Sequence, residues 1–99
     1  MTNLITHFER TTLSPKEARK SIHELTSKEK EVLALLAQGY AAKHIADIMD
    51  ISVLTVYTHL NHIYKKIGVY SATQATSYYN YAEYGVLDFS AKNKFLDYV

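Results

Sequence analysis

The chain has 99 residues, no cysteine and a net charge of +1, a length that suits one small domain with a modest core. This composition excludes disulfides and thiolate metal sites, and no apolar run approaches the roughly 18 residues that a transmembrane helix needs. With an ordinary apolar fraction of 47%, the chain is expected to be a soluble, cytoplasmic protein without a membrane anchor.

The first helix signal follows a lead-in, residues 1–13, that shows no clear period. Ser14 is a suitable N-cap, Pro15 occupies the first helical position and Glu17 the third, which together favour a helix start. The pattern predicts a short helix from Pro15 to about His23. Because this helix has few apolar side chains, it must pack on another element to persist.

A second capping box, formed by Thr26 and Glu29, predicts a helix over about residues 27–38, which ends at Gly39. Another helix is expected over about residues 42–49, although Ala41 offers no side chain to cap it. Four of its residues are expected to face inward: Ile45, Ala46, Ile48 and Met49.

The stretch from Ile51 to Gly68 predicts a helix with two different faces, capped by Ser52. Its proximity to the preceding helix predicts a helix-turn-helix. Apolar residues at spacings of three and four form one stripe: Val53, Val56, Leu60, Ile63 and Ile67. The opposite face has no carboxylate and contains Leu54, Tyr57, Thr58, Asn61 and Lys65. Such a face either contacts a polyanion or is an ordinary solvated surface.

A final predicted helix covers about residues 72–84, with a third capping box at Ser71 and Gln74. Tyr78, Tyr81 and Tyr84 form a stripe spaced three apart, and tyrosine is enriched at protein interfaces. We expect a two-fold dimer through this stripe. The alternative is that a C-terminal tail, with a short helix over residues 91–98, buries these rings within one chain.

A series of positions along the chain resembles the LuxR-type (GerE-like) helix-turn-helix domain of bacterial transcription regulators, over about residues 25–87. The matching positions are Leu25, Thr26, Glu29, Glu31, Val32, Leu33, Gly39, Lys43, Ile45, Ala46, Ile51, Ser52, Thr55, Val56, His59, Ile63, Lys65, Lys66, Ile67, Gly68, Val69, Ser71 and Ala75. The resemblance implies an all-α domain of four helices. The residue pattern adds a short N-terminal helix within residues 1–24 and a short helical extension within residues 88–99.

The resemblance also implies a function: the third helix of the domain enters the major groove of double-stranded DNA, and the fourth commonly makes a homodimer. Lys43 and Thr55 match positions that tend to contact the DNA backbone in this family. Lys65 and Lys66 supply positive charge for phosphates. Three further side chains, Tyr57, Thr58 and Asn61, lie where base edges would be read.

Several basic residues that the family usually has are replaced in this chain. The replacements are Asp47, Ile48, Tyr57, Asn61 and Ala72. Each lost phosphate contact lowers the affinity for DNA and its salt dependence. Either the protein binds DNA weakly and relies on dimerisation, or it has become a non-enzymatic module that binds or heterodimerises with another transcription regulator.

Catalytic and cofactor sites are not expected. His59 and His62 are three residues apart and His44 could approach them in the fold, but no acid or cysteine completes a metal set. Nothing resembles a catalytic triad, a phosphate-binding glycine loop or paired carboxylates, so the chain is not expected to be an enzyme. The residues before Leu25 are too few for a receiver or ligand-binding domain, so control is expected to come from elsewhere.

Overall fold

The computed structural model describes residues 13–85. Within this range the chain forms five helices and no strand: α2 (Pro15–His23), α3 (Ser27–Ala37), α4 (Ala42–Met49), α5 (Val53–Ile67) and α6 (Ala72–Tyr84). The predicted all-α fold class is confirmed. The lead-in before residue 13 and the helix expected over residues 91–98 lie outside the described residues.

Two of the predicted capping boxes are complete. The hydroxyl of Ser14 accepts a hydrogen bond from the backbone N–H of Glu17, and the Glu17 carboxylate accepts one from the Ser14 N–H. Thr26 and Glu29 make the same reciprocal pair at the start of α3. These caps satisfy backbone donors that a helix leaves unpaired, which fixes where α2 and α3 begin.

The predicted capping box at α6 is modified. Ser71 accepts from the backbone N–H of Gln74, as expected. The Gln74 side chain, however, accepts from the N–H of Tyr70, one residue before the N-cap, at 2.7 Å. The helix start was therefore predicted correctly, but one of its two hydrogen bonds was not.

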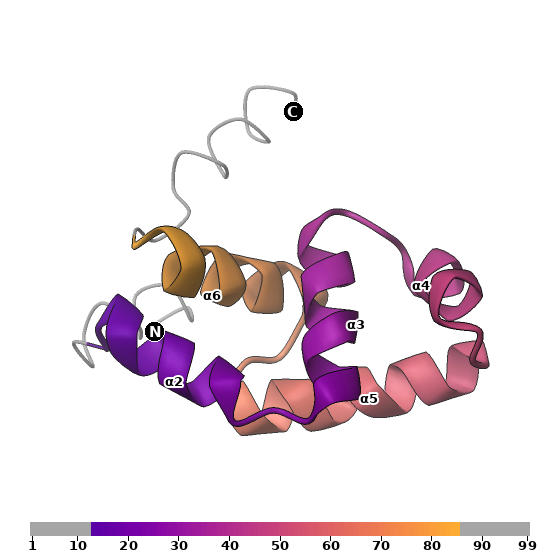
Figure 1. Cartoon of the computed structure of the whole chain (residues 1–99), viewed down its shortest axis with the longest axis horizontal. Coiled ribbons are helices and arrows are strands. Elements are labelled where there is room, and N and C mark those ends of the chain that lie inside the picture. Colours follow the sequence, from indigo (N-terminus) through magenta and orange to yellow (C-terminus); the bar gives the residue numbers. More distant parts are fainter. Residues whose placement is uncertain (1–12, 86–99) are drawn as a thin grey trace.

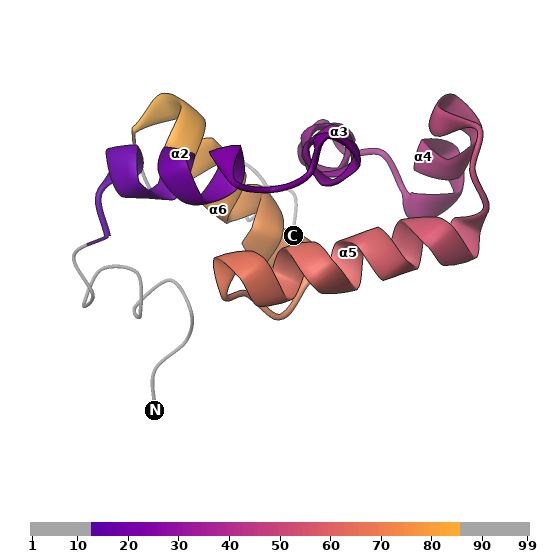
Figure 2. The same cartoon turned by 60° about the horizontal axis from the view of Figure 1, so that its bottom comes forward.

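The helices form two layers around a single core (Figures 1 and 2). Helix α5 runs along one side, α2, α3 and α6 lie on the other side of it, and α4 lies at its N-terminal end. The main contacts join α2 to α6, α3 to both α5 and α6, and α4 to α5. The buried apolar residues are Ala18, Ile22, Leu25, Val32, Leu33, Ile45, Ala46, Val56, Leu60, Ile63, Ile67, Val69, Ala75, Tyr78 and Ala82.

Two apolar residues that were expected to face inward are exposed. Ile48 is 52% exposed, although it lies only about 60° around helix α4 from the fully buried Ile45. Val53 is 39% exposed and begins α5 at the end far from α6. In both cases the residue lies at a suitable spacing, but none of residues 13–85 covers it fully.

The predicted tyrosine stripe of α6 is divided between core and surface. Tyr78 is only 3% exposed, so its expected role in a dimer interface is wrong: it packs within one chain, where α2 covers this side of α6. Tyr81 is half-buried, and its hydroxyl donates to the backbone carbonyl of Leu13. Tyr84 alone of the three is largely exposed, at 73%.

Candidate nucleic-acid interface

A tight turn joins α4 to α5 and orients α5. Asp50 adopts the left-handed conformation (φ 57°, ψ 49°) in which helices often end, although glycine is the usual residue there. The backbone N–H of Ile51 donates to the carbonyl of Ala46, which holds the turn against α4. Ser52 then caps α5 by accepting from the N–H of Thr55 at 3.0 Å. The helix-turn-helix predicted from the sequence is therefore present.

The outward face of α5 is exposed along its whole length, as predicted. Its side chains are Leu54, Tyr57, Thr58, Asn61 and Lys65, of which Leu54 is 76% and Tyr57 52% exposed. No carboxylate interrupts this face, because the chain has no acid between Ile51 and Tyr70. A polar, acid-free helix surface with a lysine in its last turn can approach a polyanion without charge repulsion.

Two threonines of α5 have their hydroxyl groups partly engaged. Thr58 Oγ1 donates to the carbonyl of Leu54 in its own helix at 3.1 Å, so the hydroxyl remains able to accept but not to donate elsewhere. Thr55 is half-buried, and its Oγ1 lies 2.8 Å from Oγ of Ser52. The backbone at the start of α5 is thus held by its own polar side chains.

Lys43 and Lys66 differ in their surroundings. Lys43 is exposed in the first turn of α4, which is the first helix of the helix-turn-helix. The structure does not bring Lys66 to the outward face of α5: its Nζ lies 2.8 Å from Oε1 of Glu29 on α3. The ammonium group is already neutralised within the protein, so it is a poor candidate for a phosphate contact.

Glu29 is the centre of a small polar cluster in the α3–α5 contact. Its side chain is nearly buried, and besides Lys66 it accepts from the backbone N–H of Thr26. Burial alone would raise the pKa of Glu29, but the hydrogen bonds from Lys66 and Thr26 outweigh it and hold this pKa below its ordinary value of 4.5. His62 Nδ1 lies 3.7 Å from the other carboxylate oxygen.

A groove of about 640 Å³ borders the outward face of α5. It is lined by residues 36–42, by the beginning of α6 and by three residues of α5: Tyr57, Leu60 and Tyr64. Burial raises the pKa of Tyr64, and the neighbouring Tyr57 adds to this effect. Tyr57 therefore belongs to two surfaces, the groove and the outward face.

Within residues 13–85, no three histidine or acidic side chains lie close enough together to hold a metal ion. In the same range no helix is long and apolar enough to cross a membrane.

Sequence reasoning had recognised Glu29 only as the partner of Thr26 in a capping box. Its pairing with Lys66, 37 positions away, was missed. A signal was available in the sequence. Val32 and Leu33 follow Glu29 by three and four residues, so the acid lies on the same face of α3 as these two apolar residues, and that face must pack against another helix. A buried carboxylate needs a cation or several donors, and Lys66 supplies the cation.

Comparisons with known proteins agree with this geometry. Residues 23–79, more than half of the chain, match the family described as bacterial regulatory proteins, luxR family. The chain is also similar to the response regulator protein VraR of Staphylococcus aureus, Staphylococcus saprophyticus and Staphylococcus epidermidis, with 41% identity over 61 residues in each case. The match covers 61% of this chain but only 29% of each relative. No solved structure matches the chain.

Proposed function

Because this chain belongs to the luxR family of bacterial regulatory proteins, we propose that it binds double-stranded DNA through α5 and thereby regulates transcription. The observation that carries the proposal is the outward face of α5, which is exposed, free of acids and held by a capped helix-turn-helix. A helix of this diameter fits the major groove of DNA. With this function, the proposal also puts its site of action in the cytoplasm, where bacterial DNA lies.

The proposed contacts are of two kinds: some position the protein on the DNA backbone, and others read the base sequence. Lys65 and Lys43 are assigned to phosphates, and Thr55, at the N-terminal turn of α5, to the DNA backbone. Tyr57, Thr58 and Asn61 are assigned to base edges, since they lie along the outward face. Lys66 is left out of this set, because its charge is balanced by Glu29.

With so few cations, one copy is expected to bind DNA weakly, so we propose that two copies bind adjacent half-sites as a homodimer. The exposed side of α6 supports this proposal. Thr73 and Tyr84 lie there, whereas Tyr78 is turned into the core. A related regulator with a similar α6 would fit the same surface as a heterodimer partner.

The test is a mobility shift of random duplex DNA at low and at moderate salt, with the wild type and an Asn61→Glu variant. The substitution adds a carboxylate to the outward face of α5 without touching the core, so it should abolish the shift while circular dichroism stays unchanged. If the wild type shifts no DNA at low salt, or if the variant shifts it equally well, the proposed function is wrong. The first result would favour a protein-interaction module instead.

A further inference from the structure

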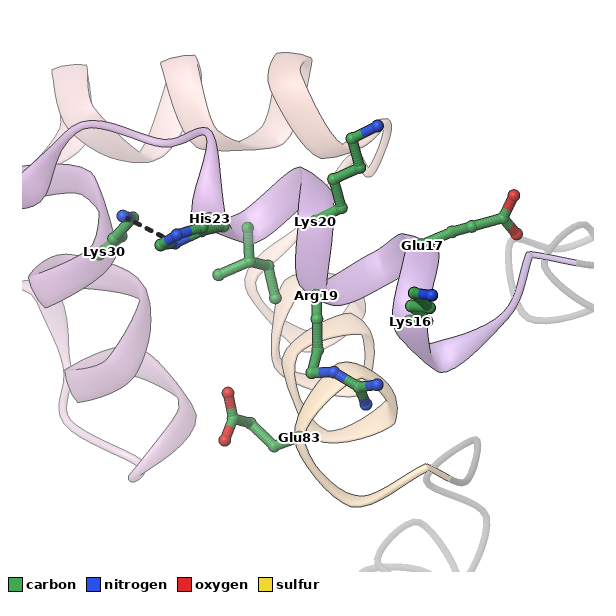
Figure 3. A pocket seen from close by; sticks show the side chains of 8 residues that line it. Lys16, Glu17, Arg19, Lys20, His23, Lys30 and Glu83 are labelled. Carbon is green, nitrogen blue, oxygen red and sulfur yellow. Dashed lines mark hydrogen bonds between the residues drawn. The ribbon is translucent and has the colours of Figure 1, made fainter.

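A second charged surface lies between α2, α3 and α6. It is an open groove of about 680 Å³, and eight residues line it: Lys16, Glu17, Arg19, Lys20, Ile22, His23, Lys30 and Glu83. Figure 3 shows the side chains of α2 along one side of the groove, Lys30 of α3 on the other and Glu83 of α6 below them. We refer to it as the α2 groove.

The α2 groove is positively charged. Four lysine and arginine side chains line it against two carboxylates. Within residues 13–85, neither Lys16 nor Lys20 has a carboxylate within ion-pair distance. Glu17 is engaged in capping α2, and Lys30 Nζ faces Nδ1 of His23 at 3.4 Å. Lys20 interacts electrostatically with Glu17 and helps to lower the pKa of that carboxyl group, but the groove as a whole keeps an excess of cations over carboxylates.

The walls of the groove are held in place. Arg19 Nη1 donates to the carbonyl of Ala82 at 3.0 Å, which ties α2 to the end of α6. Ile22 contributes an apolar lining and belongs to the hydrophobic core. The helices that carry these cations are therefore held in place, and Ile22, which is 9% exposed, offers a ligand a small apolar area between them.

The position of the groove separates it from the proposed DNA contact. None of its residues comes from α5. The helices that line it lie on one side of α5 (Figure 2), and the residues of the outward face of α5 are exposed and not packed against these helices. DNA held on α5 would leave the groove open. Moreover, Lys16, Arg19 and Lys20 precede residue 23, where the match to the family begins, so the groove depends on residues outside the family match.

We propose that the α2 groove binds an acidic segment of a partner protein that also carries an apolar side chain. The cations would pair with carboxylates of the segment, and Ile22 would contact its apolar side chain. A peptide fits better than a nucleic acid, because it can place uncharged residues beside Glu17 and Glu83, whereas a nucleic acid carries a negative phosphate at every nucleotide. The protein would then join a DNA site to an acidic partner protein.

The experiment measures fluorescence anisotropy of a labelled peptide of alternating glutamate and leucine, against a matched peptide with glutamine in place of glutamate. The wild-type chain should bind the acidic peptide in a saturable, salt-sensitive manner. It should bind the neutral peptide at least about tenfold more weakly, because several charge contacts, each of modest strength, are lost together. Failure to bind the acidic peptide would overturn the proposal.

Charge-reversal variants test whether the peptide binds in the α2 groove. A double charge reversal, Lys16→Glu with Lys20→Glu, should weaken peptide binding about tenfold or more. The reversals Lys28→Glu, on an exposed lysine of α3 outside the groove, and Lys65→Glu, on α5, should leave it unchanged. Equal binding by the double variant and the wild type would overturn the proposal, provided circular dichroism shows both to be folded.

Addition of duplex DNA tests whether the α2 groove binds an acidic protein segment or a nucleic acid. Peptide binding should persist when DNA saturates the protein, because the two sites face different directions. Displacement of the peptide by DNA would instead assign the groove to nucleic acid. This arm rests on the proposed function, because it requires that α5 binds DNA. The peptide titrations without DNA test the α2 groove whether or not DNA binds, so failure of one proposal can be told from failure of the other.

Discussion

The ammonium of Lys66 lies 2.8 Å from the carboxylate of Glu29, and this pair links the end of α5 to the beginning of α3. Glu29 is 3% exposed and also completes the cap of α3, so one side chain fixes a helix start and a helix contact. A carboxylate in such a place is stabilised only as long as its donors remain. The pair explains why a lysine expected to contact DNA belongs to the fold.

We predict that Glu29→Ala lowers the free energy of unfolding by roughly 2–3 kcal/mol, through loss of the cap and of the partner of Lys66. Urea unfolding followed by circular dichroism measures this. The matched control is Glu31→Ala, an exposed acid of the same helix, which should change stability by less than about 0.5 kcal/mol. Equal losses in both variants would mean that Glu29 has no special role.

The same residue predicts how stability depends on pH. Because the folded-state pKa of Glu29 is lowered, its charged form stabilises the fold above its ordinary pKa of 4.5. This contribution should decrease as the pH falls below that value and disappear once the pH passes below the lowered pKa. Glu29→Gln should therefore flatten the pH dependence of unfolding on the acidic side. The comparison uses a Glu17→Gln background, since Ser14 also lowers the pKa of Glu17.

For DNA binding, we predict that Lys65→Ala and Lys43→Ala each weaken binding to all sequences about equally. Each should reduce the slope of log affinity against log salt by roughly one unit, since one phosphate contact is lost. Fluorescence anisotropy over a salt series measures the slope. Lys28→Ala, on α3, is the control and should leave the slope unchanged. Unchanged slopes in both test variants would remove the proposed electrostatic contact.

Asn61→Ala should relax the preference at one base pair per half-site while non-specific affinity stays nearly the same. An asparagine can pair with adenine through two hydrogen bonds, worth about 1–3 kcal/mol of discrimination. Selection of binding sites from random DNA, before and after the substitution, reveals the affected position. An equal loss on selected and random DNA would show that Asn61 contacts only the backbone.

In α6, the buried Tyr78 and the exposed Tyr84 lead to opposite predictions. Tyr78→Glu should unfold the domain, because it places a charge in the core. Tyr84→Glu should keep the helical circular dichroism but weaken the proposed dimer, as measured by sedimentation. Lys43→Glu, on the exposed surface of α4, is the control. A Tyr84→Glu variant that remains fully dimeric would place the interface elsewhere.

Much of the fold was predictable, because helix starts depend on local chemistry. The hydroxyls of Ser14, Thr26 and Ser52 cap backbone groups three residues away, so the sequence alone locates these helices. Such features need no knowledge of distant parts of the chain.

The remaining features depend on contacts between distant residues. Tyr78 and Tyr84 have the same side chain, and only the packing of α2 on α6 decides that one is buried and the other exposed. Lys65 and Lys66 are adjacent, and only the position of Glu29 gives them different roles. The expected DNA contacts of α5 remain predictions, because their exposure is confirmed but their binding is not.

The contact between α2 and α6 affects the rate at which the chain folds. Arg19 bonds to Ala82 and Tyr81 to Leu13, so the beginning and the end of the described chain lie together, as Figure 1 also shows. Bringing these ends together closes a loop over almost all of residues 13–85, and the conformational entropy lost in that closure is offset by the contact of α2 with α6 and by their contacts with α3 and α5. A circular permutant that joins the two ends and opens the chain after Gln38 should therefore fold faster than the natural order, because the slowest encounter has become a local one.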